Sequence, residues 1–157
     1  MRILIMGNSG SGKSHRARML AGQHGLAHLD LDTIVWAPGQ IAVARTPEQV
    51  QADLRAFMSA NEKWVVEGCY GELIDAALPF CSELVFMNPG RETCLANNRR
   101  RPWEPHKYAS MEAQQAKLAF LLDWVAGYYE RDDTMSYARH RRLFDGFDGN
   151  KSEVTAL

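Results

Sequence analysis

The chain has 157 residues, 46% of them hydrophobic and 24% charged, which predicts one globular domain spanning residues 1–157. A net charge of −1 excludes a general electrostatic attraction to nucleic acid or anionic membranes, and no apolar run approaches the length of a membrane span. The three cysteines lack C-x-x-C spacing and indicate neither a disulfide framework nor a zinc site. Free thiols in a reducing cytosol, and hence a cytoplasmic protein, are expected.

The first predicted elements are a buried strand over Ile3–Met6 and a helix over Lys13–Gln23, which ends before Gly25. The strand begins so early that no signal peptide is expected. The turn between the two elements has the pattern G-x-x-x-x-G-K-S, which is typical of a phosphate-binding loop. The predicted nucleotide-binding residues are Gly7, Asn8, Ser9, Gly10, Ser11, Gly12, Lys13 and Ser14.

The residue types in this loop suit the binding of a nucleoside triphosphate. Glycines at positions 7, 10 and 12 let the backbone adopt positive φ and turn its amides toward a phosphate. The start of the helix adds free N–H donors and the positive end of the helix dipole. Lys13 supplies a charge for the β- and γ-phosphates, and the Ser14 hydroxyl is placed to bind Mg²⁺. ATP and Mg²⁺ are therefore the expected cofactors; a glycine-rich turn with a chance Lys-Ser pair is the alternative.

After the first helix, the sequence predicts a short strand over Ala27–Asp30 and an irregular loop from Trp36 to Arg45. The next helix is predicted from Pro47 to about residue 60, with Thr46 and Gln49 as its capping box. Apolar residues recur along this helix at helical spacing, so one of its faces is expected to be buried.

The rest of the chain alternates between short apolar runs and helical patterns. The predicted elements are a strand over Trp64–Val66, a helix over Glu72–Leu78, a strand over Leu84–Met87, a helix over Arg91–Arg101, a loop over Pro102–Tyr108, a long helix with Leu118, Leu121, Leu122, Val125 and Tyr128 or Tyr129 on one face, and a last edge strand at Arg142–Phe144. Strands separated by helices predict right-handed βαβ units and a parallel sheet. The expected fold is therefore α/β: a three-layer α/β/α P-loop NTPase fold with about five strands and a short lid at about residues 99–110.

Three acidic residues follow predicted strands, where ligands bind in parallel sheets. Asp30 could hold a metal-bound water, and Asp32 is expected to point the same way in an extended chain and accept the proton of an acceptor hydroxyl. Glu67 is expected to support the Mg²⁺ shell together with Ser14. The alternatives are that Asp30 caps a turn, that Asp32 begins a helix or turn, and that Glu67 is a solvated strand end.

The run Arg99-Arg100-Arg101 ends the predicted fourth helix. Guanidinium groups there could clamp the triphosphate and the acceptor, and Arg99 and Arg101 are the predicted catalytic members alongside Lys13 and Asp32. Consecutive residues on a helix point about 100° apart, so one or two of the three can face the site, and the others would be solvated. Arg45 could hold an acidic substrate or lie on the surface.

With these residues assigned, the chain resembles the adenylate kinase and shikimate kinase group of small P-loop phosphotransferases. It is most similar to the adenylate-kinase-related bacterial proteins labelled DNA topology modulation proteins. The resemblance rests on four segments that span most of the chain: Gly7–Ser14, His28–Asp32 with Trp36–Gly39, Trp64–Tyr70, and Leu84–Arg101.

This resemblance implies that Asp30 and Asp32 serve metal and acceptor, and that the Glu67-Gly68 step supports the Mg²⁺ site. The sequence departs from these relatives at two positions: Asn88 precedes a proline where they usually have aspartate, and Asn97 stands where they commonly have a lid arginine. No glycine-rich arginine motif for a nucleoside monophosphate follows Glu67.

The leading functional hypothesis is an ATP-dependent kinase that moves the γ-phosphoryl group of Mg-ATP to a small polar acceptor, such as a nucleotide or nucleoside. The second hypothesis is a nucleotide-binding regulatory module that acts on nucleic acid through Arg99–Arg101 and Arg139–Arg142. Near-neutral charge and the absence of a recognition-helix or zinc motif argue against nucleic acid as a partner. A bare ATPase with water as acceptor is the third.

Overall fold

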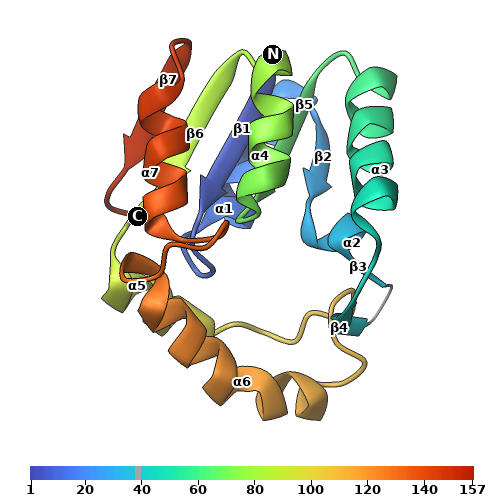
Figure 1. The fold of residues 1–157 in the computed structure, drawn as a ribbon. Coiled ribbons are helices and arrows are strands. Elements are labelled where there is room, and N and C mark those ends of the chain that lie inside the picture. Colours follow the sequence, from blue (N-terminus) through green and yellow to red (C-terminus); the bar gives the residue numbers. More distant parts are fainter. Residues whose placement is uncertain (38–39) are drawn as a thin grey trace.

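A computed structural model describes residues 1–37 and 40–157, and its centre is a five-stranded parallel sheet with the strand order β2-β5-β1-β6-β7 (Figure 1). These strands are β1 (Arg2–Gly7), β2 (Ala27–Asp30), β5 (Trp64–Gly68), β6 (Glu83–Met87) and β7 (Asn150–Val154). A separate antiparallel pair is formed by β3 (Trp36–Ala37) and β4 (Gln40–Ala44). The predicted parallel sheet of about five strands is confirmed.

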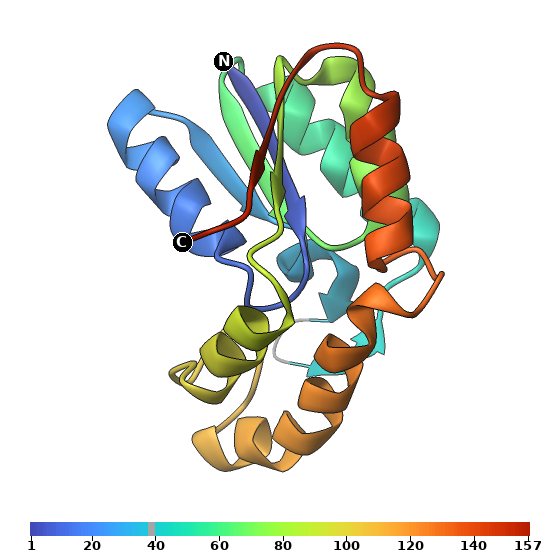
Figure 2. The same cartoon turned by 90° about the vertical axis from the view of Figure 1, so that its left-hand side faces the viewer.

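Helices cover both faces of the sheet and also lie beyond the carboxyl ends of its strands. They are α1 (Lys13–His24), α2 (Asp32–Val35), α3 (Pro47–Ala60), α4 (Gly71–Ala77), α5 (Arg91–Arg99), α6 (Met111–Ala126) and α7 (Tyr137–Gly146), with 3-10 turns η1 (Leu78–Phe80) and η2 (Gly127–Tyr129). Seen edge-on, α1 lies on one side of the sheet, and α3, α4 and α7 lie on the other, with α5 and α6 below (Figure 2). This is the expected three-layer arrangement.

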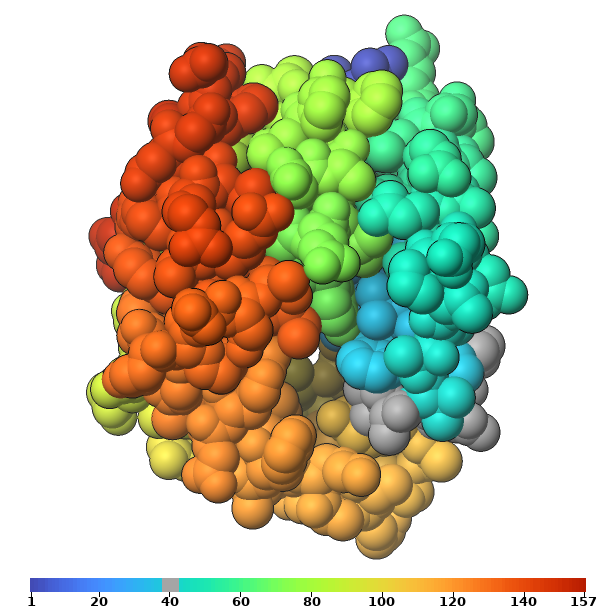
Figure 3. Space-filling view, viewed as in Figure 1, coloured from blue at the N-terminus to red at the C-terminus, as the bar shows by residue number. Residues whose placement is uncertain are grey.

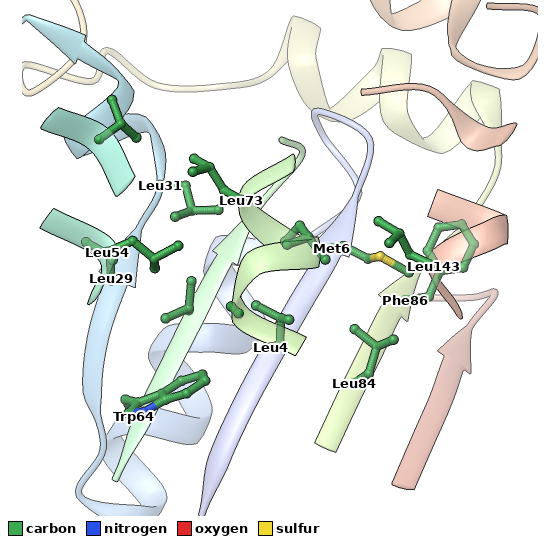
Figure 4. Close-up of a cluster of buried hydrophobic side chains, with 14 residues drawn as sticks. Leu4, Met6, Leu29, Leu31, Leu54, Trp64, Leu73, Leu84, Phe86 and Leu143 are labelled. Atoms are coloured by element: carbon green, nitrogen blue, oxygen red, sulfur yellow. The ribbon is translucent and has the colours of Figure 1, made fainter. Parts of the chain in front are cut away.

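Side chains along β1 point alternately to the two faces of the sheet, so this one strand packs against the helices on both sides. Ile3 and Ile5 pack into the cluster that includes Ala17 of α1, whereas Leu4 and Met6 pack into the larger cluster beneath α3, α4 and α7 (Figure 4). All four side chains are buried because successive residues of a central strand point to opposite, covered faces. β1 is therefore the middle of the core as well as the element that leads into the phosphate-binding loop.

The last part of the chain differs from the prediction. The predicted edge strand at Arg142–Phe144 is wrong, because these residues belong to α7, which Ser136 caps and which buries His140 and Leu143 at helical spacing. A short apolar run cannot distinguish helix from strand. The edge strand is instead β7, formed by largely exposed polar residues that pair with β6 from Glu83↔Asn150 onward.

Two further boundaries change. The predicted loop from Trp36 to Arg45 contains the β3 and β4 pair, with Pro38 and Gly39 outside the described residues. The predicted helix to Arg101 ends at Arg99, since the residue before Pro102 disfavours helical backbone. The capping box of Thr46 and Gln49 and the strand over Ala27–Asp30 are confirmed.

Strand register brings the predicted acids to one edge. In the parallel pairs, Glu67 of β5 lies opposite both Asp30 of β2 and Ile5 of β1, two residues before Gly7. The carboxyl ends of three strands therefore meet beside the start of α1. None of the helices in residues 1–37 and 40–157 is long and apolar enough to span a membrane.

A buried histidine ties α7 to the end of β5. His140 is 0% exposed, and its Nε2 donates to the Cys69 carbonyl at 2.8 Å, so its Nδ1 accepts the Tyr128 hydroxyl at 2.6 Å. This arrangement requires a neutral ring. Burial is the largest cause that lowers the pKa of His140, to about 4.

The contribution of His140 to stability should therefore fall as the solution is acidified. Because the folded-state pKa of His140 lies below the unfolded value of 6.5, its contribution is present above pH 6.5 and is lost toward pH 4. Between pH 7 and pH 5 we expect His140 to account for a loss of about 2 kcal/mol in the free energy of unfolding, measured with urea. Asp30 shifts in the opposite direction, so the diagnostic quantity is the difference between wild type and His140→Gln. The exposed His24→Gln should retain the wild-type pH dependence; a His140→Gln that retains it too would contradict the assignment.

Candidate functional site

The loop from Gly7 to Ser14 joins the end of β1 to the start of α1 and has the backbone conformation that the sequence predicted. Gly7, Gly10 and Gly12 have φ values of 156°, 78° and 93°. A Cβ atom at Gly10 would lie 2.4 Å from the Cys94 carbonyl oxygen, because α5 packs directly against the loop. Glycine at this position thus permits both the turn and the close approach of α5.

Side chains of α5 and a backbone carbonyl of α6 hold the loop in place. Ser9 Oγ donates to Asn98 Oδ1 at 3.0 Å, and Asn97 Nδ2 donates to the Gly10 carbonyl at 2.9 Å. The buried Asn8 side chain donates to the Val125 carbonyl at 3.2 Å. Asn97, which replaces an expected arginine, therefore contacts the loop backbone. The Lys13 ammonium lies across the loop and donates to the Asn8 carbonyl at 2.7 Å.

Ser14 and Glu67 meet at the edge of the sheet. Ser14 Oγ donates to Glu67 Oε1 at 2.8 Å, and His28 Nε2 lies 3.3 Å from the same oxygen. Glu67 is 1% exposed, so it is a buried acid and not the solvated strand end of the alternative interpretation. A hydroxyl and a carboxylate are hard oxygen ligands that suit Mg²⁺. In the described part of the chain, no cluster of three or more His, Cys, Asp or Glu side chains could hold a metal ion unaided.

The expectation that Asp32 continues an extended chain after Asp30 is wrong. Asp30 Oδ1 accepts the Asp32 amide at 2.9 Å, which turns the chain so that Asp32 begins α2. The Asp32 carboxylate still faces the cleft. Its Oδ1 accepts the Tyr70 hydroxyl, which in turn accepts Trp36 Nε1 at 2.9 Å. Trp36 and Tyr70 therefore orient Asp32.

Lys107 is the site residue that the sequence analysis missed. Its ammonium lies 2.8 Å from Asp32 Oδ2, 3.3 Å from Glu104 Oε2 and 3.7 Å from Asp30 Oδ2, and its side chain is 11% exposed. It belongs to residues 100–110, the segment between α5 and α6 that is called the lid loop below. A lysine in an irregular segment carries no local motif, so only the folded chain shows its partners.

The surrounding charges shift the pKa values of Asp30 and Asp32 in opposite directions. The pKa of Asp30 is raised to about 6, first by burial and then by the charges of Glu67 and Asp32, each of which outweighs the opposing effect of Lys107. Burial also opposes the ionisation of Asp32, but the Lys107 ammonium and the hydrogen bonds from Lys107 and Tyr70 hold the pKa of Asp32 below its usual value. At neutral pH Asp32 is thus a carboxylate with two committed partners.

The three consecutive arginines point in different directions. Arg101 Nη2 donates to Ser9 Oγ at 3.3 Å, and its Nη1 lies 3.5 Å from Glu104 Oε1. Arg100 lines the same cleft as Arg101 and bonds Asn97 Oδ1 at 2.9 Å. Arg99 is exposed at the end of α5 and lies outside that lining.

Lys13, Ser14, Asp32, Glu67, Arg101 and Lys107 line one cleft of about 830 Å³. Its walls come from the phosphate-binding loop, α1, the start of α2, the end of β5, the lid loop and the residues around the end of β7. In Figure 3 the surface is hollowed between the residues that follow α6 (orange) and α2 (blue to cyan), and Asp32 is the residue of these segments that also lines the cleft. The cleft can therefore hold a phosphate-bearing ligand at the loop and a second small molecule near Asp32.

Comparisons with known proteins bear on the fold. No family model and no curated protein matches the chain. The chain is similar to a sugar kinase from Janibacter sp. HTCC2649, whose structure is unliganded, with a TM-score of 0.53 and 16% identity, covering 98% of this chain and 83% of that one. This chain has the same fold as that kinase.

Two other solved structures align with TM-scores below 0.5. A shikimate kinase from Acinetobacter baumannii in complex with shikimate has a TM-score of 0.45 and 19% identity, covering 90% of each chain. A gluconokinase from Sinorhizobium meliloti 1021 has a TM-score of 0.46 and 17% identity, covering 99% of this chain and 83% of that one. The predicted relation to DNA topology modulation proteins is untested by these matches and stays a prediction.

The close approach at Gly10 predicts a large effect of one methyl group. Gly10→Ala places Cβ against the Cys94 carbonyl and the Asn98 side chain at positive φ, so it should lower the free energy of unfolding by at least about 1 kcal/mol. Gly22→Ala, in α1 with nothing within 4 Å, should instead raise it by about 0.5–1 kcal/mol. Urea unfolding measures both; equal stabilities of the two variants would show that α5 does not press on the loop.

Proposed function

We propose that this protein is an ATP-dependent phosphotransferase that moves the γ-phosphoryl group of Mg-ATP to a hydroxyl group of a small polar acceptor. The observation that carries the proposal is the position of the phosphate-binding loop, with Lys13 and the Ser14–Glu67 pair, in the same cleft as Asp32 and Lys107. Phosphoryl transfer requires a held phosphate, compensation of negative charge and an acceptor oxygen in line. The cleft brings residues for each of these together.

The donor half of the cleft is assigned to the triphosphate. The loop amides and the start of α1 would hold the phosphates, and the Lys13 ammonium would exchange the Asn8 carbonyl for phosphate oxygens. Arg101, already beside Ser9, is the better placed of the two predicted catalytic arginines, and Arg100 replaces Arg99 as the second candidate. Ser14 and Glu67 would hold Mg²⁺, which neutralises charge on the phosphates when bound. Asp30, predicted as a metal residue, would support the ligands around the ion.

The acceptor half is assigned to Asp32. A hydroxyl group that enters beside Asp32 would compete with Lys107 for the Oδ2 atom, while Tyr70 continues to hold Oδ1. Once the Lys107 contact is given up, the carboxylate becomes more basic and can accept the proton of the acceptor hydroxyl. Lys107 then becomes free to balance charge elsewhere in the cleft. Asp32 is therefore the proposed general base.

The nucleic-acid alternative is less well supported by the basic residues invoked for it. Arg139 pairs with Asp75 at 3.2 Å, Arg141 pairs with Glu153, and His140 between them is buried. This stretch offers few uncommitted cations to a phosphate backbone. A bare ATPase needs no binding site for a second substrate, so it would not explain the buried pair of Asp32 and Lys107.

An ADP-release screen tests the proposal. Purified protein with Mg-ATP is offered nucleoside monophosphates, nucleosides, polyols, amino sugars and hydroxy acids, and acceptor-dependent ADP release is measured. A kinase releases ADP well above the background for its acceptor class. Release that no metabolite alters would favour the bare ATPase, and nucleic-acid binding that weakens steeply with salt would favour the regulatory module.

Lys13→Ala should abolish this ADP release, with a loss of at least about 100-fold in kcat, because the charge on the β- and γ-phosphates is removed. The exposed Lys63→Ala, which makes the same change far from the loop, should match wild type. Turnover of Lys13→Ala at the wild-type rate would remove the loop from the reaction.

Asp32→Asn should lower kcat by about 100-fold or more while the Kd for ATP, measured by calorimetry, changes little. The amide preserves shape and removes the base. Asp123→Asn, on the exposed face of α6, is the matched control and should behave as wild type. Equal kcat values for Asp32→Asn and wild type would exclude Asp32 as the base.

A further inference from the structure

Charged side chains of both signs line the cleft. Lys13, Arg16 and Arg18 come from α1, and Arg100 and Arg101 come from the start of the lid loop. Asp32 of α2, Glu67 of β5, and Glu104 and Lys107 of the lid loop line it as well. A triphosphate at the phosphate-binding loop therefore meets the basic residues of α1, and an acceptor beside Asp32 meets the acidic residues together with Lys107.

The acidic side chains of this region are balanced by a residue of this chain. Three carboxylates, those of Asp30, Asp32 and Glu104, lie within 3.7 Å of the single Lys107 ammonium. Glu104 is also approached by Arg101 at 3.5 Å and by His106 at 3.8 Å. An ammonium group is thus already bound in the place assigned to the acceptor.

Two other basic side chains of this region, Arg45 and His28, already have partners outside the proposed acceptor site. Arg45, which the sequence offered as a holder of acidic substrates, donates to the Ile34 carbonyl at 2.9 Å and pairs with Asp53 at 2.6 Å. His28 lies against Glu67. Residues 38–42, whose side chains are outside the described part of the structure, are Pro, Gly, Gln, Ile and Ala, so they bring no charge.

Resting on the proposed kinase activity, we propose that the acceptor is an uncharged or positively charged hydroxyl compound, such as a polyol, nucleoside or amino sugar, and that Glu104 sets this preference. An anionic acceptor would stand beside Asp30, Asp32 and Glu104 in a partly desolvated cleft, where repulsion between like charges is weakly screened. If it recruited Lys107 as its partner, it would draw the ammonium away from Asp30 and Glu104 as well as from Asp32. An uncharged acceptor leaves Lys107 in reach of Asp30 and Glu104, and a cationic acceptor can take its place.

Acceptors matched in skeleton and different in charge test the inference. We would compare kcat/KM for glucose, glucosamine and gluconate, and for adenosine and AMP, with Mg-ATP saturating. In the set that supports turnover, the uncharged or cationic member should exceed the anionic member by about tenfold or more. A preference for the anionic member would overturn the charge inference and leave the kinase proposal standing. If no compound in either set or in the broader screen stimulates ADP release, the kinase proposal is overturned, and this inference with it.

The role of Glu104 is tested by a variant that removes its charge and keeps its shape. Glu104→Gln should shift the ratio of kcat/KM for anionic over uncharged acceptors upward by about three- to tenfold, because one of the three carboxylates is neutralised. Glu112→Gln, an exposed residue in the first turn of α6, makes the same charge change outside the cleft and should leave the ratio unchanged. A purely structural role of Glu104 would lower activity toward both acceptors together; the wild-type ratio in Glu104→Gln would overturn its assignment.

Discussion

Parallel pairing of β5 with both β1 and β2 is the constraint on which the candidate site depends. Because Glu67 lies opposite Ile5 on one side and Asp30 on the other, the phosphate-binding loop and the acids reach the same edge of the sheet. A slip of one residue in either pair would turn alternate side chains to the other face and separate Ser14 from Glu67. The buried apolar residues on both faces of β1 and β5 fix the register, so the packing of the core also sets the geometry of the site.

Above that edge, the site is organised by charge. Basic residues of α1 and the lid loop and acidic residues of α2, β5 and the lid loop face the same cleft, and Lys107 of the lid loop pairs with Asp32. The acids lie close enough that burial and mutual repulsion raise the pKa of Asp30, whereas Lys107 and Tyr70 keep Asp32 ionised. Two neighbouring carboxylates therefore differ in proton affinity, which is how a site can use one as support and the other as a base.

Polar contacts behind the site make its walls rigid. Asn8, Ser9 and Asn97 join the loop to α5 and α6, so the loop conformation is held from the side opposite the strand. On the far side, His140 connects α7 to the backbone at Cys69, directly after β5. These contacts use buried and partly buried side chains, and they position the ends of β1 and β5 relative to each other.

The sequence by itself determined the parallel α/β fold, the elements from β1 to α5 apart from α2 and the β3 and β4 pair, and the residues of the phosphate-binding loop, because each of these rests on local signals: apolar runs, glycines at required backbone turns, and caps such as Thr46. It placed the last strand at Arg142–Phe144, where α7 lies, because an edge strand such as β7 needs no apolar pattern and an amphipathic helix can hold a short apolar run. Only the tertiary structure decided that Asp32 begins α2, that Arg101 and Arg100 line the cleft and Arg99 does not, and that Lys107 pairs with Asp30 and Asp32. The start of α2 depends on a hydrogen bond between neighbours, Asp30 and Asp32, which competes with an extended chain. The contacts of Arg101 with Ser9 and of Lys107 with the aspartates join distant segments, so they are set by how the helices and the lid loop pack over the sheet, which no local pattern encodes.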